Sequence, residues 1–115
     1  MYRTGDVVLI PFPYTDLTAT KTRPAVVVSS DLYLANYPDL VVCYISSRLA
    51  IATKALDYVI REWKEAGLLK PSFLRPKLAT IVPDLVVLHV GALAAVDRGG
   101  LDRILRQALA LEAFQ

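Results

Sequence analysis

The polar side chains of this chain offer charge and hydroxyl chemistry in place of thiol or metal chemistry. Its 115 residues include one histidine and one cysteine, so neither an internal disulfide nor a zinc site built from cysteine and histidine can form. The glycine patterns of dinucleotide-binding and phosphate-binding loops do not occur in the sequence either. We therefore expect no metal ion and no cofactor. Any chemistry has to come from arginine, lysine and hydroxyl groups that bind anions such as phosphate.

Arg23 has the sequence setting that best suits phosphate binding. Pro24 follows it directly, and a proline restricts the residue before it to extended backbone. A guanidinium held in this way, where a loop meets a strand, can bind a phosphate through two parallel hydrogen bonds. The alternative is a solvated surface arginine that happens to precede a strand.

Two further segments carry groups of the same kind. Ser46 and Ser47 follow an apolar run, and a hydroxyl there can donate to a phosphate oxygen. Alternatively, the two serines only terminate a strand. Lys70, Arg75 and Lys77 form a basic segment that either follows a nucleic-acid backbone or lines an ordinary solvated edge.

The other polar and aromatic candidates have simpler structural explanations. His89 lies in an apolar run and is expected to be packed or to face solvent. Trp63 and Tyr58 are able to stack on bases, although the surroundings of Trp63 are more typical of a core anchor. Asp16 is the one carboxylate of residues 13–23 and either acts as a base or closes a turn.

Short β-branched and apolar runs predict the strands that position these groups. The runs are bounded by glycine, proline or polar residues, as strands in small β-rich domains are. Residues 13–23, which are polar and rich in threonine, are expected to form an exposed loop. We expect strands at residues 6–12, 24–29, 40–46, 56–60, 72–75, 78–82 and 85–90.

Helical segments complete the predicted fold. Asp31 is expected to cap a short helical turn, and Gly67 to end another at residues 61–66. The clearest helix lies near the C-terminus, where apolar residues recur at i, i+3, i+4, i+7 and i+8 from Leu101, with Asp97 as the expected N-cap. These elements predict a mainly β fold with some helix (α+β), namely a small antiparallel β-barrel closed by an amphipathic helix.

The composition sets limits on partners and location. The chain length predicts a single domain over residues 1–115. Hydrophobic residue types make up 55% of the chain, and such a surplus in a small domain predicts a buried interface, most simply that of a homodimer. The net charge of +2 excludes a broad footprint on nucleic acid and leaves room for a local site. We expect no membrane span, because polar residues and a glycine interrupt the apolar stretch 78–96, and we expect a cytoplasmic location.

Two segments near the N-terminus form a specific pair of motifs. Residues 5–17 read GDVVLIPFPYTDL, and residues 21–29 read KTRPAVVVS. A G-D-V-V run, a polar loop and an R-P-A-V-V run at this spacing resemble the PemK/MazF family, the toxins of type II toxin–antitoxin pairs. The likeness continues at residues 44–47, 66–72, 78–81 and 91–93 and covers about residues 4–110.

The resemblance implies an SH3-like β-barrel with short helices, usually a homodimer, that acts as a sequence-selective, metal-independent endoribonuclease on single-stranded RNA. In this family the ribose 2′-hydroxyl attacks the adjacent phosphate and leaves a 2′,3′-cyclic phosphate and a 5′-hydroxyl. Because the substrate supplies the nucleophile, the protein needs only a base, an acid and groups that stabilise the charged phosphorane. The implied partners are the RNA substrate and a cognate antitoxin with a disordered, anionic tail.

The resemblance also implies roles for individual residues. Arg23 matches the arginine of the R-P motif, which stabilises the phosphorane, and Ser46 matches the Thr or Ser that hydrogen-bonds the scissile phosphate. Residues 13–22 match the loop that gates the RNA groove. The implied RNA-binding residues are Asp16, Thr20, Lys21, Ser47, Arg75 and Lys77.

Two departures from the family pattern leave the base unassigned. Some members carry an acid shortly before the R-P motif, where this chain has a Thr-Ala-Thr run and Asp16 lies earlier. Some members also combine an acid with an arginine in the segment that corresponds to residues 72–80, where this chain has Arg75 and no acid. Two other functions stay open: a CcdB-like toxin that binds and inhibits DNA gyrase, and a catalytically silent SH3-like binding module.

Overall fold

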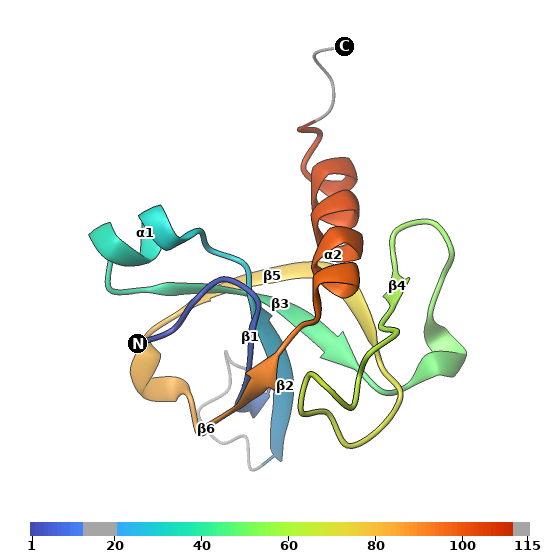
Figure 1. The fold of residues 1–115 in the computed structure, drawn as a ribbon, viewed down its shortest axis with the longest axis horizontal. Coiled ribbons are helices and arrows are strands. Elements are labelled where there is room, and N and C mark those ends of the chain that lie inside the picture. The colour runs from blue at the N-terminus through green and yellow to red at the C-terminus, as the bar shows by residue number, and fades with distance from the viewer. Residues whose placement is uncertain (13–20, 112–115) are drawn as a thin grey trace.

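Within residues 1–12 and 21–111, six antiparallel strands form one curled sheet, a half-barrel, and a helix follows near the C-terminus of the chain (Figure 1). The computed structural model describes residues 1–12 and 21–111. The strands are β1 (Asp6–Phe12), β2 (Lys21–Val27), β3 (Leu40–Ser46), β4 (Tyr58–Val59), β5 (Phe73–Ile81) and β6 (Leu88–Ala92), in the spatial order β4-β5-β3-β2-β1-β6. The helical elements are α1 (Asp31–Asn36), the 3-10 turns η1 (Leu49–Ile51) and η2 (Pro83–Leu85), and α2 (Ala95–Ala108). The predicted mainly β fold with a C-terminal amphipathic helix is confirmed.

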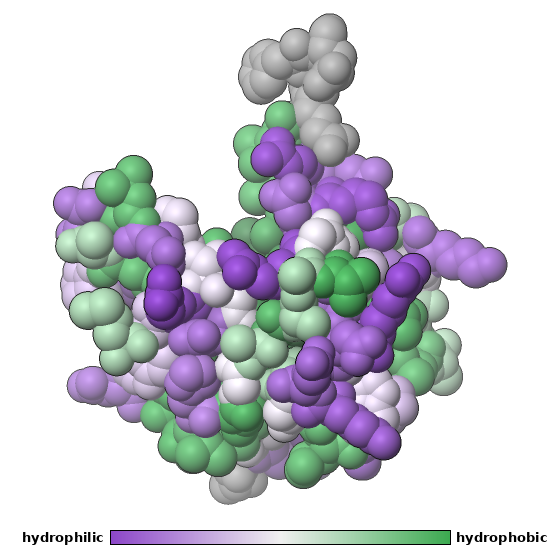
Figure 2. Space-filling view, in the orientation of Figure 1, coloured by the Kyte–Doolittle hydropathy of each residue, from purple (hydrophilic) through white to green (hydrophobic). Residues whose placement is uncertain are grey.

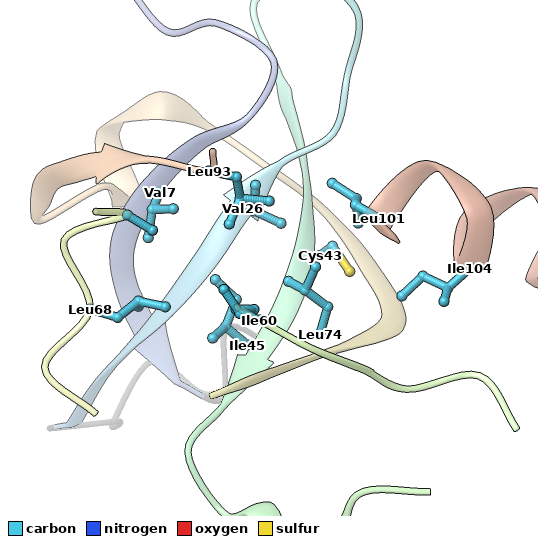
Figure 3. Packing of buried hydrophobic residues seen from close by; sticks show 11 residues of the cluster. Val7, Val26, Cys43, Ile45, Ile60, Leu68, Leu74, Leu93, Leu101 and Ile104 are labelled. Carbon is cyan, nitrogen blue, oxygen red and sulfur yellow. The ribbon is translucent and has the colours of Figure 1, made fainter. Parts of the chain in front are cut away.

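Each face of the curled sheet carries its own apolar cluster, because successive side chains of a strand point to opposite sides. On one side, which we call the helix face, strand residues such as Val26 and Cys43 pack against Leu101 and Ile104 of α2 (Figure 3). The other side, the opposite face, has a cluster built from Val8, Ile10, Ala25, Val27, Leu40, Val42 and Ile81. Full burial of each valine, leucine or isoleucine side chain in these clusters contributes about 1.5–3 kcal/mol to folding.

Apolar side chains also remain exposed beside the two helices. A hollow of about 380 Å³ lies between α1 and α2 (Figure 2), and its lining includes Tyr33, Leu105 and Leu109. Leu32 of α1 is 76% exposed, and Leu111 is 54% exposed. Part of the apolar surplus seen in the composition therefore lies on the surface.

Asp97 caps a different segment from the one predicted. The N-cap of α2 is Ala94, and Asp97 lies in the first turn of that helix, so the prediction of Asp97 as N-cap is wrong. Its fully buried carboxylate accepts hydrogen bonds from the Tyr58 hydroxyl (2.8 Å) and from the backbone N–H groups of Arg61 (2.8 Å) and Glu62 (2.9 Å). These donors come from a distant part of the chain, so helical periodicity alone could not reveal them. Asp97 thus fastens the segment after β4 to α2.

Two glycines allow this segment to approach its neighbours closely. Gly67 ends the turn that follows β4 with a φ of +87°, in the region that favours glycine. A Cβ at Gly67 would collide with the backbone carbonyl of Val90 in β6. A Cβ at Gly100 of α2 would collide with the Tyr58 ring. The segment between β4 and β5 can therefore pack directly on β6, and β4 can pack directly on α2.

β5 is one strand rather than the two that Pro76 was expected to separate. Cys43 of β3 pairs with Leu78, and the next residue, Tyr44, pairs with Arg75. Pro76 and Lys77 therefore form a β-bulge in β5. The Cys43 thiol donates to the Arg75 carbonyl at an Sγ–O distance of 3.0 Å. Burial raises the pKa of this thiol to about 12, so it stays protonated and keeps its donor hydrogen.

The remaining differences from prediction lie at the ends of elements. β2 begins at Lys21 instead of residue 24, so Arg23 lies inside a strand rather than at a loop junction. The side chain of Ser30 caps α1, and Asp31 lies in the first turn of that helix. β6 starts later than predicted because η2 precedes it.

Candidate active site on the opposite face of the sheet

Arg23 and Ser46 lie on the same face of two neighbouring strands. Ala25 of β2 pairs with Tyr44 of β3, and Arg23 and Ser46 each lie two residues further toward the same end of the sheet. Because side chains alternate along a strand, both share the opposite face with Ala25. On its other side, Arg23 pairs with Ile10 of β1. The two residues predicted to be catalytic therefore share one face of the sheet, each two residues beyond the last paired residues of β2 and β3.

The surroundings of the two side chains differ. Arg23 is exposed, whereas Ser46 is 4% exposed. The Ser46 Oγ accepts a hydrogen bond from the backbone N–H of Arg48 at 3.1 Å. This bond occupies one acceptor position and leaves the hydroxyl hydrogen to act as a donor. An exposed guanidinium and an oriented hydroxyl on the same face are both groups that bind the oxygens of a phosphate.

Further cations share this face. Lys21 lies two residues before Arg23 in the same strand. Lys77 of β5 places its Nζ 5.8 Å from the centre of the Tyr44 ring. Tyr44 lies two residues before Ser46 on the same face of β3, so this face carries an aromatic ring as well as cations. Sequence reasoning missed Tyr44, although its position two residues before Ser46 was a signal for a shared face.

Arg75 also points to this face, but an acid holds it. Its Nε and Nη2 atoms donate to the two carboxylate oxygens of Asp57 at 3.1 and 2.8 Å, and its Cζ lies 5.3 Å from the centre of the Phe73 ring. The Asp57 side chain is 3% exposed. Hydrogen bonding to Arg75 holds the pKa of this carboxyl below its ordinary value of 3.8. Arg75 thus has an acidic partner from outside residues 72–80, namely Asp57, which lies before β4 in a segment where sequence reasoning assigned no site residue.

The Asp57–Arg75 pair predicts how stability changes with acidity. Because the pKa of Asp57 is lowered in the folded protein, the pair stabilises the fold fully above the ordinary value of 3.8 and loses this effect as the pH falls through the lowered value. Between about pH 6 and about pH 3, the wild type should lose more free energy of unfolding than Asp57→Asn. Denaturant unfolding at the two pH values measures this difference. Equal losses in the two proteins would show that the pair does not stabilise the fold.

The other predicted RNA-binding residues do not all lie with Arg23 and Ser46. Ser47, one residue after Ser46, lines a pocket of about 390 Å³ together with Thr22 and Leu68. Leu68 belongs to the cluster of the helix face, so Ser47 lies on the other side of the sheet from Ser46. Asp16 and Thr20 lie outside the residues that the structure describes.

The two remaining candidates, Trp63 and His89, make packing contacts within the fold. Trp63 packs against the apolar cluster of the helix face, as a core anchor would. The half-exposed His89 ring contacts Tyr2 edge-on, and its Nε2 lies 3.0 Å from the Gly91 carbonyl oxygen. Within the described parts of the chain, the histidine, cysteine and acidic side chains do not form a group of three or more that could hold a metal ion. Those parts also contain no helix long and apolar enough to cross a membrane.

A protein-family model and several solved structures match this chain. The family model described as PemK-like, MazF-like toxin of type II toxin–antitoxin system matches residues 3–109. An endoribonuclease from a mycobacterial species, solved in complex with its cognate antitoxin, superposes with a TM-score of 0.77 at 16% identity and covers 96% of this chain and 97% of its own. A second mycobacterial endoribonuclease has a TM-score of 0.72 at 16% identity, covering 95% and 91%.

A third solved structure has the same fold. The Mycobacterium tuberculosis toxin MazF-mt6 has a TM-score of 0.72 at 16% identity and covers 91% of this chain and 96% of its own. No curated protein sequence matches the chain. The family model spans nearly the whole chain, and on that match the chain belongs to the PemK-like, MazF-like toxins of type II toxin–antitoxin systems.

Proposed function

We propose that this toxin is an endoribonuclease that cleaves single-stranded RNA without a metal ion. The observation that carries the proposal is the placement of Arg23 and Ser46 on one face of neighbouring strands, with Lys21 and Lys77 on the same face. Family membership supports it, as do two solved structures of the same fold that are endoribonucleases.

The reaction needs few protein groups, because the RNA supplies the nucleophile. The ribose 2′-oxygen attacks the adjacent phosphorus and gives up its proton to a base. The bond from phosphorus to the 5′-oxygen breaks, and that oxygen takes up a proton. The products are a 2′,3′-cyclic phosphate and a 5′-hydroxyl. Asp16 is the carboxylate nearest to Arg23 along the sequence, and it is our candidate for the base.

Arg23 and Ser46 would act on the charge that develops at phosphorus. The guanidinium of Arg23 donates two hydrogen bonds to the non-bridging oxygens, whose negative charge grows in the phosphorane. The Ser46 hydroxyl donates a third. Both residues extend from regular strands, which position side chains more accurately than loops do. Lys21 and Lys77 bind the flanking phosphates, and the Tyr44 ring offers a surface on which a base stacks.

The proposed partners follow from the same surface and from the composition. A cognate antitoxin with an anionic tail would occupy the cationic positions of Lys21, Arg23 and Lys77 and exclude RNA. A homodimer would cover part of the apolar surface beside the helices, such as Leu32 and Leu111.

Cleavage in the presence of EDTA tests the proposed function. Purified protein is incubated with a long single-stranded RNA, and the ends of the products are identified chemically. We expect cleavage at a limited set of sites, with 2′,3′-cyclic phosphate and 5′-hydroxyl ends. Arrest of DNA gyrase without RNA cleavage would instead indicate a CcdB-like toxin, and the absence of both activities a silent binding module.

A further inference from the structure

The chain between Ser46 and β4 is tied back to β5. We call residues 47–57 the connecting segment. At its far end, the Asp57 carboxylate accepts hydrogen bonds from Arg75 and also from the backbone N–H of Thr53 at 2.8 Å. Nearer its start, the carbonyl oxygen of Ile51 accepts a hydrogen bond from Arg75 Nη2 at 3.1 Å. One guanidinium therefore holds the connecting segment at two points.

These contacts continue to the Ser46 hydroxyl through hydrogen bonds. Arg75 Nη2 donates to the Ile51 carbonyl, and the Ile51 N–H donates to the Arg48 carbonyl at 3.0 Å. The Arg48 N–H in turn donates to Ser46 Oγ at 3.1 Å. The position of the Arg48 N–H, and with it the orientation of the Ser46 hydroxyl, thus depends on where Arg75 holds η1.

We propose that Asp57 and Arg75 are positioning residues that orient the Ser46 hydroxyl through the connecting segment. With one Ser46 lone pair occupied by the Arg48 N–H, the hydroxyl hydrogen remains available to donate to a phosphate bound on this face. The inference rests on the proposed function, and it assigns Arg75 a role different from direct contact with RNA.

The surroundings of the ion pair argue against Arg75 as a phosphate ligand. Asp57 neutralises the guanidinium through two hydrogen bonds and is itself almost completely buried. A phosphate that displaced Asp57 would leave a buried carboxylate without its cationic partner, at a large cost in free energy. Lys77, on the same strand, places its ammonium group over the Tyr44 ring instead of against an acid. Lys77 is therefore the better phosphate ligand of β5.

Kinetics of RNA cleavage in two backgrounds test the inference. In the wild-type background, Asp57→Asn and Arg75→Gln should each lower kcat roughly 10- to 100-fold with little change in KM, and the double variant should be no worse than either single one. In a Ser46→Ala background, both substitutions should have little further effect on kcat. Arg75→Lys, which retains the charge and loses the paired geometry, should also lower kcat while the fold remains intact by circular dichroism.

The salt dependence of RNA binding supplies the matched control. Lys77→Gln should reduce the slope of log K against log salt by about one, whereas Arg75→Gln should leave it unchanged. A reduced slope for Arg75→Gln, or an undiminished effect of Asp57→Asn in the Ser46→Ala background, would overturn the inference while the proposed function stands. A wild-type protein that cleaves no RNA would overturn both.

Discussion

Replacing Arg23 with alanine should lower the rate of RNA cleavage by about 10²–10³-fold or more, because in the proposed mechanism Arg23 supplies the main donors to the phosphorane oxygens. The loss should appear in kcat, since the negative charge on these oxygens grows only as the phosphorane forms. Arg23→Lys should recover a small part of the rate, because an ammonium group keeps the charge and loses the paired geometry. The test compares the initial rates at which the wild type, Arg23→Ala and Arg23→Lys cleave a defined single-stranded RNA in EDTA.

Arg106→Ala is the matched control for Arg23→Ala. Arg106 is an exposed arginine of α2, where it pairs with Asp102 at 2.9 Å, and α2 packs on the helix face of the sheet. Its removal takes away one positive charge and should leave the cleavage rate within about twofold of wild type, because surface ion pairs contribute little. Equal rates for Arg23→Ala and the wild type would remove Arg23 from the mechanism.

Replacing Asp97 with alanine should lower the free energy of unfolding by about 3–5 kcal/mol, a large share of the stability of a small domain. The substitution leaves the Tyr58 hydroxyl and the N–H groups of Arg61 and Glu62 without their acceptor. Asp97→Asn should cost less, since the amide keeps one acceptor oxygen. Urea unfolding at neutral pH measures the free energy of unfolding of the wild type and of both variants.

Asp102→Ala is the control for Asp97→Ala. Asp102 lies on the same helix with a 63% exposed side chain and contacts Arg106, so its loss should cost at most about 0.5 kcal/mol. If both variants unfolded at the same urea concentration, the buried carboxylate would not be what fastens the segment after β4 to α2.

The local parts of the fold were predictable from the sequence, and the long-range parts were not. The bounds of β1 and β3 follow from β-branched runs between glycine, proline and polar residues, which are local signals. The partners of Asp97 and Asp57 come from other segments of the chain. Such pairs exist only once the sheet has formed, and neither periodicity nor capping rules reveal them.

The candidate site was also predictable only where its signals are local in the sequence. The R-P motif and the serine at the strand end pointed to Arg23 and Ser46, and the alternation of side chains could already have placed Ser47 on the other side of the sheet from Ser46. The contacts of Arg75 could not be predicted in this way. Its charge suggested RNA binding, whereas its hydrogen bonds are with Asp57 and Ile51.

Cleavage of an RNA that lacks one 2′-hydroxyl tests the central claim most directly. Once a cleavage site has been mapped, the same oligonucleotide is made with a single 2′-deoxy nucleotide on the 5′ side of the scissile phosphate and incubated with the wild-type toxin in EDTA. If the RNA supplies the nucleophile, cleavage at that phosphate should be lost, while the substituted oligonucleotide still competes with the parent RNA for binding. Cleavage of the 2′-deoxy oligonucleotide at the same phosphate would contradict the proposed mechanism.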